Sequence, residues 1–201
     1  MINRELYMEQ ITPFIDKPFV KVITGIRRCG KSVVLRLIRE ELLRRGVSED
    51  YIIYMNFESF EWIDMKEAKA LYAHIREATK ASGKYYILLD EIQEVTDWEK
   101  AVNAFLVDLD VDIYVTGSNS RLLSSEFSTY LAGRYVAFHI MTLSFKEYLL
   151  FHNLSLTISA SDRKAEFLKY LRMGGFPAIH TANYDYNAIY KIVYDIYSSV
   201  I

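Results

Sequence analysis

Gly25-Ile26-Arg27-Arg28-Cys29-Gly30-Lys31-Ser32 is the stretch of this 201-residue chain that decides its fold. It matches the pattern G-x-x-x-x-G-K-[S/T] and lies between an apolar run, Phe19–Thr24, and an amphipathic run, Lys31–Arg45. In a strand-to-helix turn of this kind, glycines let backbone N–H groups point inward, where they and the positive helix end surround phosphate oxygens. The sequence therefore predicts a phosphate-binding loop.

Each residue of this loop has an expected part in nucleotide binding. Lys31 is expected to reach the β- and γ-phosphates, and the Ser32 hydroxyl to coordinate the Mg²⁺ that bridges them, because Mg²⁺ prefers hard oxygen ligands. The two arginines could also pair with acidic neighbours or face solvent, and any small residue would serve at Cys29. The predicted nucleotide-contacting set of the loop is Gly25, Ile26, Arg27, Arg28, Cys29, Gly30, Lys31, Ser32 and Val33.

Short apolar runs alternate with longer amphipathic runs, which is the pattern of a parallel β-sheet covered by helices. The expected strands are Phe19–Thr24, Tyr51–Phe57, Tyr85–Asp90, Asp112–Thr116 and Tyr135–Ile140. The expected helices between them are Lys31–Arg45, Asp64–Ala81, Asp97–Leu109 and Ser120–Leu131. The predicted fold class is α/β, a three-layer P-loop NTPase sandwich with a five-stranded parallel sheet.

The pattern changes after Ile140, where only helical runs follow. These are Phe145–His152, Asp162–Arg172 and Asp185–Val200, interrupted by Met173-Gly174-Gly175-Phe176-Pro177. We therefore expect a P-loop core at residues 1–141, with a small all-helical lid and the start of a C-terminal region at residues 142–201. The last helix has no Gly or Asn cap and no trailing Pro, which suggests a truncation of a longer protein.

Two adjacent carboxylates, Asp90 and Glu91, end the third expected strand. At the carboxyl edge of a parallel sheet, Asp90 is expected to bind Mg²⁺ directly or through water, and Glu91 to polarise the attacking water. In isolation such a pair could merely solvate a strand end. Together with the phosphate loop, it predicts hydrolysis as well as binding.

Small polar side chains follow the fourth expected strand, in Thr116-Gly117-Ser118-Asn119-Ser120. Ser118 or Asn119 could sense a γ-phosphate and the attacking water by hydrogen bonding. Clusters of Ser, Asn and Gly equally form turns and helix N-caps, so both interpretations stay open.

Composition and charge restrict the class of protein. Hydrophobic residues make up 51% of the chain and charged residues 25%, as in ordinary globular domains. The net charge of -2 neither indicates nor excludes a nucleic-acid partner. The single Cys29 fits a reducing cytoplasm. Because no signal-peptide pattern and no long apolar run is present, we expect neither secretion nor a membrane span.

The chain resembles a family of AAA+-like ATPases of bacteria and archaea that carries a domain of unknown function, number 4143, behind its ATPase core. The resemblance spans nearly the whole chain and implies that this C-terminal domain is absent or truncated at Ile201. The segments that carry it are GIRRCGKS, LLDEIQ, VTGSNS, Leu131-Ala132-Gly133-Arg134, LSFKE at 143–147, and Gly174-Gly175-Phe176-Pro177.

The resemblance also implies roles for two of these segments. Arg134 lies where such ATPases place an arginine finger, although it could equally pair with a nearby carboxylate. Phe176 and Pro177 resemble a lid motif that lies against the adenine base, although they could equally be core and turn residues.

The predicted function is Mg²⁺-dependent binding and hydrolysis of ATP to ADP, driving a conformational change that reaches the lid and a neighbouring subunit or C-terminal domain. The alternatives are a slow nucleotide-gated switch for a protein or DNA partner, and a P-loop kinase with an acceptor other than water. No N-K-x-D sequence is present, which favours adenine over guanine. The predicted catalytic residues are Glu91, Lys31, Arg134, Ser118 and Asn119, and the predicted metal ligands are Ser32 and Asp90.

Overall fold

The computed structural model describes residues 3–118, 122, 130–181 and 185–198. The chain forms two compact units. The first, here called the sheet unit, comprises Glu5–Gly25 and Lys31–His139, and the second, here called the helical unit, comprises Met1–Arg4, Ile26–Gly30 and Ile140–Ile201. The middle of the predicted phosphate loop therefore belongs to the helical unit. The predicted boundary between residues 141 and 142 stays a prediction.

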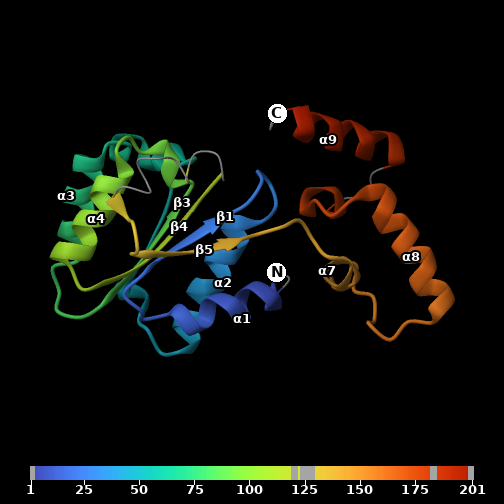
Figure 1. Cartoon of the computed structure of the whole chain (residues 1–201), viewed down its shortest axis with the longest axis horizontal. Helices are drawn as coiled ribbons and strands as arrows, with labels where there is room; N and C mark the ends of the chain where they lie inside the picture. Colours follow the sequence, from blue (N-terminus) through green and yellow to red (C-terminus); the bar gives the residue numbers. More distant parts are fainter. Residues whose placement is uncertain (1–2, 119–121, 123–129, 182–184, 199–201) are drawn as a thin grey trace. The chain divides into compact units, whose positions relative to one another are not determined.

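The sheet unit is built on a parallel sheet with the strand order β2-β3-β4-β1-β5 among the described residues (Figure 1). The strands are β1 Val20–Thr24, β2 Ile52–Asn56, β3 Tyr85–Asp90, β4 Val111–Gly117 and β5 Tyr135–His139. This confirms the predicted α/β fold with five parallel strands. Strand β4 lies between β1, which leads into the phosphate loop, and β3, which ends in Asp90.

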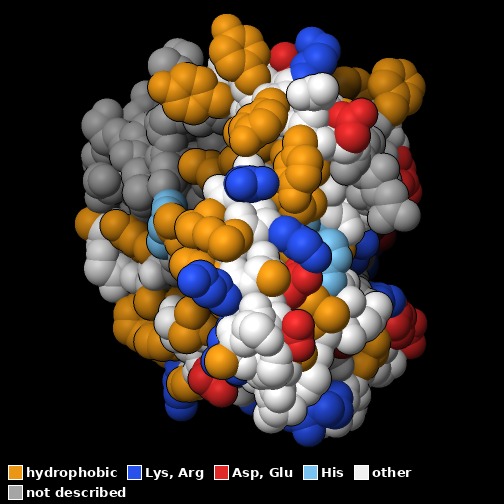
Figure 2. All heavy atoms as spheres, turned by 90° about the vertical axis from the view of Figure 1, so that its right-hand side faces the viewer, with side chains coloured by type: hydrophobic (Ala, Val, Ile, Leu, Met, Phe, Trp, Pro, Cys, Tyr) orange, Lys and Arg blue, Asp and Glu red, His pale blue; other side chains and the backbone are white. Residues whose placement is uncertain are grey.

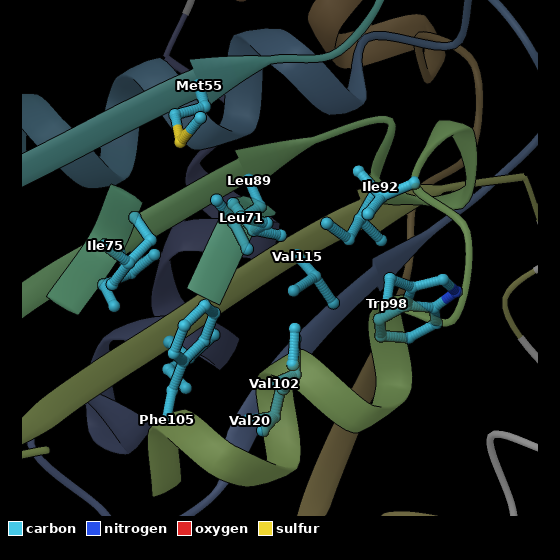
Figure 3. Close-up of a cluster of buried hydrophobic side chains, with 14 of the residues drawn as sticks. Val20, Met55, Leu71, Ile75, Leu89, Ile92, Trp98, Val102, Phe105 and Val115 are labelled. Carbon is cyan, nitrogen blue, oxygen red and sulfur yellow. The ribbon is translucent and has the colours of Figure 1, made fainter. Parts of the chain in front are cut away.

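The hydrophobic core of the sheet unit lies on the face covered by α3, Ala68–Ala78, and α4, Trp98–Asp108. Figure 3 shows Leu71 and Ile75 of α3, and Val102 and Phe105 of α4, directed toward the strands. Fully burying each such side chain stabilises the fold by about 1.5–3 kcal/mol. Alternate residues of β1, β3 and β4 supply the facing surface, namely Val20, Val22, Ile87, Leu89, Ile113 and Val115.

The opposite face of the sheet is covered by α1, Glu5–Ile11, and α2, Lys31–Arg44 (Figure 1). The helical spacing of the buried positions Val34, Ile38 and Leu42 matches the amphipathic pattern that predicted α2. Helix α1 was not predicted, since its seven residues contain only two buried side chains, Tyr7 and Ile11. A run this short carries too little periodicity to be identified from sequence.

The predicted helix Asp64–Ala81 is wrong at its beginning. Residues Phe60–Met65 form a 3₁₀ helix, and Glu67 is extended, with φ −122° and ψ 138°. The Thr96 N–H donates to the Lys66 carbonyl at 2.9 Å, and the Thr96 carbonyl accepts from Ala68 N–H at 3.0 Å. These long-range backbone bonds hold residues 66–68 in an extended bridge, so that α3 begins only at Ala68.

The helical unit contains α7 Phe145–Phe151, α8 Ala160–Met173, a 3₁₀ helix Pro177–His180, and α9 Tyr186–Ser198. The predicted C-terminal helices are therefore confirmed, with small shifts at their ends. Helix α7 begins with a capping box, in which Ser144 Oγ accepts from Glu147 N–H and the Glu147 side chain accepts from Ser144 N–H. Most of the predicted helix Ser120–Leu131 lies outside the described residues.

Two sequence motifs that are far apart in the chain contact each other in the helical unit. Leu143 N–H donates to the Gly175 carbonyl at 2.7 Å, and Tyr170 Oη donates to the Leu143 carbonyl at 2.8 Å. A Cβ atom at position 175 would lie 2.4 Å from the Leu143 carbonyl oxygen, so only glycine fits there. The glycine pair of the G-G-F-P segment is therefore explained in part by close backbone packing.

Hydrophobic side chains are also exposed on α8 and α9 (Figure 2). No described helix is both long enough and apolar enough to cross a membrane. The exposed hydrophobic side chains on these two helices are Phe167, Leu168, Leu171, Tyr186, Tyr190, Tyr194 and Tyr197.

A buried ion pair ties β1 to β4 at the amino edge of the sheet. Lys21 is 0% exposed and its Nζ contacts Asp112 Oδ1 and donates to the Lys17 carbonyl at 2.9 Å. Tyr114 Oη and the Asp16 N–H both donate to Asp112 Oδ2 at 2.8 Å. Burial lowers the pKa of Lys21, and the Asp112 charge opposes this shift. Because both carboxylate oxygens are hydrogen-bonded, the pair is compensated despite its burial.

A histidine pair in the helical unit gives a pH-dependent prediction. His180 Nε2 lies 2.9 Å from the Gly174 carbonyl, and His180 Nδ1 lies 3.1 Å from His152 Nε2. Burial lowers the pKa of His180, and the neighbouring His152 lowers it further, whereas the bond to Gly174 opposes the shift. Stability from neutral His180 is therefore fully present above the unfolded pKa near 6.5 and is lost as pH falls through the lower folded pKa.

We expect His180→Gln to reduce this loss, because Gln can donate to Gly174 and accept from His152 without titrating. The measurement is the free energy of unfolding in urea at pH 7.5 and pH 5.0 for both proteins. Wild type should lose more stability than the variant between these values. Equal losses would contradict the assigned role of His180.

Candidate functional site

The carboxyl edge of the sheet gathers the polar residues of the sheet unit that the sequence singled out. Parallel strands end at a common edge, so β1, β3 and β4 place Gly25, Asp90 and Ser118 at their carboxyl ends. Helix α2 begins with Lys31, which is 4% exposed. The order of the strands thus places Lys31, Asp90 and Glu91 at one edge of the sheet.

Asp90 is fully buried and both of its carboxylate oxygens are hydrogen-bonded. Thr116 Oγ1 donates to Asp90 Oδ1 at 2.5 Å, and Tyr54 Oη donates to Asp90 Oδ2 at 2.9 Å. Burial, followed by the Asp90 charge, raises the pKa of Tyr54 well above its ordinary value, which keeps this phenol a donor. A carboxylate has about four lone-pair sites, so each oxygen can still accept from a metal-bound water.

Glu91 has a constrained backbone. Its φ of 53° and ψ of 50° lie in the left-handed region, which is uncommon for residues other than glycine and costs of the order of 1–3 kcal/mol. The Glu91 N–H donates to Thr116 Oγ1 at 2.9 Å, so a residue of β4 stabilises this conformation. Strained backbone of this kind clusters at functional sites.

The Glu91 side chain contacts Lys31 and Gln93. Glu91 Oε1 lies 3.3 Å from Lys31 Nζ, and Glu91 Oε2 accepts from Gln93 Nε2 at 2.6 Å. Lys31 Nζ also donates to the Gly25 carbonyl at 3.3 Å. The structure therefore brings together the lysine of the phosphate loop and the predicted general base.

Gln93 explains the glycine that ends β4. A Cβ atom at Gly117 would lie 2.1 Å from Gln93 Oε1 and 2.7 Å from Leu122 Cγ. Among the described residues, Gln93 Oε1 is a buried oxygen without a hydrogen-bond partner. Gln93 is thus held against the strand end, where its amide fixes the position of Glu91.

Residues 26–30 of the loop are described within the helical unit. Cys29 N–H donates to the Ile26 carbonyl at 3.3 Å, which closes a turn, and Arg28 adopts a left-handed φ of 65°. The side chains of Ile26, Arg27 and Arg28 are exposed, whereas Cys29 is fully buried. The Cys29 carbonyl accepts from Arg4 Nη1 at 3.0 Å.

The remaining predicted residues stand as follows. Ser32 and Val33 lie in the first turn of α2 and are half-buried. Ser118 is also half-buried, and its carbonyl accepts from Leu122 N–H at 3.0 Å. Arg134 is exposed and its Nη1 donates to Asn103 Oδ1 at 3.0 Å, and no described carboxylate forms an ion pair with it. Asn119 lies outside the described residues. Pro177 is half-buried at the start of a 3₁₀ helix.

A family model described as "AAA domain" matches residues 17–149 of the chain. This range holds the phosphate loop, the two carboxylates and the whole sheet. The chain belongs to this AAA domain family. Both the five-stranded sheet and the contact between Lys31 and Glu91 lie within the matched range.

The relatives of this AAA domain chain include proteins without an assigned function. An uncharacterized protein of Haemophilus influenzae is 44% identical over 184 residues, which cover 91% of the chain and 46% of that protein. An uncharacterized protein of Methanocaldococcus jannaschii is 36% identical over 184 residues, covering 89% of the chain and 39% of that protein. The chain therefore spans less than half the length of these relatives.

Solved structures share the fold at low sequence identity. AMPPCP-bound DnaA from Aquifex aeolicus matches with a TM-score of 0.57 and 16% identity, covering 96% of the chain and 62% of that structure. RuvB from Thermotoga maritima matches with a TM-score of 0.55 and 16% identity, covering 89% and 59%. The Aeropyrum pernix ORC1 protein in complex with DNA matches with a TM-score of 0.51 and 17% identity, covering 83% and 50%. These likenesses support the P-loop NTPase fold of this AAA domain.

Three residues at the carboxyl edge were not predicted as site residues: Tyr54, Gln93 and Thr116. Thr116 could have been found from its position at the end of a strand, because such residues share one edge with Asp90. Tyr54 is 36 residues from Asp90 in the chain, and no local pattern indicates their contact.

Proposed function

We propose that this AAA domain binds Mg²⁺-ATP and hydrolyses the bond between its β- and γ-phosphates. The observation that carries the proposal is the 3.3 Å contact between Lys31 and Glu91, with Asp90 and Thr116 beside Glu91. A cation for phosphate and a carboxylate for water are the two groups that such hydrolysis needs from the protein.

In this proposal each side chain has a separate task. Lys31 donates its N–H groups to phosphate oxygens and neutralises part of their charge. Glu91 orients the attacking water and accepts its proton, and the bond from its own N–H to Thr116 keeps this carboxylate in place. Gln93 Nε2, at 2.6 Å, fixes the second carboxylate oxygen, so that the base has a defined orientation.

The residues also fit a hard divalent cation. Mg²⁺ keeps several waters and is bound by one or two protein oxygens together with phosphate oxygens. We assign Ser32 as a direct ligand and Asp90 as a ligand through water, since both Asp90 oxygens already accept hydroxyl hydrogen bonds. When bound, Mg²⁺ would neutralise charge that develops on the phosphate oxygens.

A slow nucleotide-gated switch is the second candidate function. One observation favours it: Glu91 Oε1 lies 3.3 Å from Lys31 Nζ, so the base must separate from this ammonium before turnover. The chain also spans less than half of its relatives. We propose that the remainder of such a protein, expected to include the domain of unknown function 4143, carries the partner-binding function.

The test is the initial rate of Mg²⁺-ATP hydrolysis over a range of protein concentrations, with Arg134→Ala in parallel. Arg134 is exposed, so a second copy could receive its guanidinium at the γ-phosphate. We expect the specific activity of wild type to rise with concentration, and that of Arg134→Ala to stay low and constant. A constant wild-type rate equal to that of Arg134→Ala would exclude a finger supplied by a second copy.

The same assay, with Glu91→Gln as a further variant, separates the two candidate functions. A wild-type rate no higher than that of Glu91→Gln, with nucleotide still bound, would exclude a self-sufficient ATPase and favour the switch. If the domain is a self-sufficient ATPase, omission of Mg²⁺ is expected to abolish hydrolysis.

A further inference from the structure

Arg4 is a buried cation that joins three separate segments of the helical unit. The residue is 2% exposed, and its side chain reaches the phosphate loop, α7 and the segment that precedes α7. Nε donates to Glu147 Oε1 at 2.5 Å, Nη1 to the Cys29 carbonyl at 3.0 Å, and Nη2 to the Met141 carbonyl at 2.8 Å. A planar guanidinium is suited to such a set because its donors point in fixed, different directions.

The contact with Cys29 determines the direction of a backbone N–H group in the loop. The described peptide bonds are all trans, so the Cys29 carbonyl and the Gly30 N–H point to opposite sides of one peptide plane. Because Arg4 holds the carbonyl, the Gly30 N–H must point away from Arg4. Gly30 has a φ of 105°, and a Cβ atom there would lie 3.2 Å from Arg4 Nη1, so glycine suits both the backbone and the close approach.

Glu147 balances the buried charge of Arg4 and links it to the start of α7. While Oε1 contacts Arg4, Oε2 accepts from the Ser144 N–H at 2.8 Å and from Ser144 Oγ at 2.9 Å. A buried ion pair is tolerated when its remaining donors and acceptors are satisfied, as they are here. The helix cap and the loop carbonyl are therefore held by one connected network.

We propose that Arg4 is a positioning residue of the phosphate loop. It fixes the Cys29–Gly30 peptide so that the Gly30 N–H is presented to a bound phosphate, and it links this orientation to the first turn of α7 through Glu147. The inference rests on the proposed nucleotide binding and adds a residue that lies outside the G-x-x-x-x-G-K-S sequence.

The test compares the dissociation constants of ADP and AMP for wild type and Arg4→Ala, each measured by isothermal titration calorimetry. We expect Arg4→Ala to weaken ADP binding about tenfold, by analogy with the loss of groups that orient the ligands of a metal ion. AMP binding should change much less, because its single phosphate depends less on the loop. Arg4→Lys should be intermediate, since an ammonium keeps the charge but not the planar arrangement of donors.

Asp112→Asn is the matched control, because it also breaks a buried ion pair but lies at the amino edge of the sheet. It is expected to lower the melting temperature while leaving the ratio of the ADP and AMP constants unchanged. Should Arg4→Ala fail to fold, Glu147→Gln provides the second variant, because it removes the charge that holds Arg4 and keeps an oxygen for Ser144. The preference of Glu147→Gln for ADP over AMP should be lower than that of wild type, as expected for Arg4→Ala.

The possible results separate this inference from the proposed function. If wild type bound ADP no more tightly than Lys31→Met, the proposed nucleotide site would itself be wrong. If wild type bound ADP tightly and every Arg4 and Glu147 variant kept the wild-type ratio, Arg4 would have a structural role only, and the inference would be overturned.

Discussion

Glu91→Gln is expected to lower the rate of ATP hydrolysis about a thousandfold while ATP remains bound, a loss within the range for removal of a general base. The substitution keeps the shape of the side chain and removes its charge. Because a neutral amide at this position attracts Lys31 less, the ammonium becomes more available to phosphate, and ATP affinity should stay equal or increase. The measurement is single-turnover phosphate release together with the dissociation constant of a fluorescent ATP analogue.

Glu94→Gln provides the control for this prediction. Glu94 belongs to the same turn, its side chain is exposed, and it lies 3.8 Å from Lys66 instead of Lys31. Hydrolysis should be close to wild type in this variant. A Glu91→Gln protein that hydrolyses ATP at the wild-type rate would remove Glu91 from the role of general base.

Lys31→Met is expected to weaken ATP binding about a hundredfold, which corresponds to about 2.7 kcal/mol. Methionine retains much of the apolar length of the side chain but cannot donate to phosphate oxygens. The substitution also leaves Glu91, whose side chain is 14% exposed, without the ammonium that it contacts at 3.3 Å. The dissociation constants of ATP and ADP, measured by calorimetry, should both rise.

Arg44→Ala tests whether loss of any cation on α2 has the same effect. Arg44 lies in the last turn of this helix, is largely exposed, and pairs with Glu41 at 2.8 Å. Its substitution should leave ATP affinity unchanged, because exposed ion pairs contribute little and Arg44 lies far along the helix from Lys31. Equal losses in both variants would indicate a general electrostatic effect of α2 and contradict direct phosphate contact by Lys31.

Most of the sheet could be predicted because its strands are short, apolar and separated by helices of clear periodicity. Tyr85–Asp90 has the predicted bounds, since a run of five apolar residues ends abruptly in Asp90 and Glu91. The beginning of α3 could not be predicted, because the backbone bonds of Lys66 and Ala68 to Thr96 override local helix propensity. Helix α1 is too short for its two buried residues to establish a period.

The candidate site was predictable only where its residues belong to local motifs. Lys31 follows from the loop pattern and Asp90 with Glu91 from a charged strand end. The contact of Arg4 with Glu147 joins residues 143 positions apart, and nothing in the local sequence around either residue indicates it. The orientation of Glu91 by Gln93 and Thr116 likewise depends on the left-handed backbone at position 91, which residue type alone does not predict.

Thr116 gives strand β4 a mechanical importance beyond its place in the sheet. A single hydroxyl accepts from the Glu91 N–H and donates to Asp90 Oδ1, so the backbone of Glu91 and the carboxylate of Asp90 are both tied to the end of β4. A displacement of β4 along its axis would therefore disturb both of these hydrogen bonds at once. Strand β4 is thus the element through which a change elsewhere in the sheet reaches the predicted metal ligand and the predicted general base together.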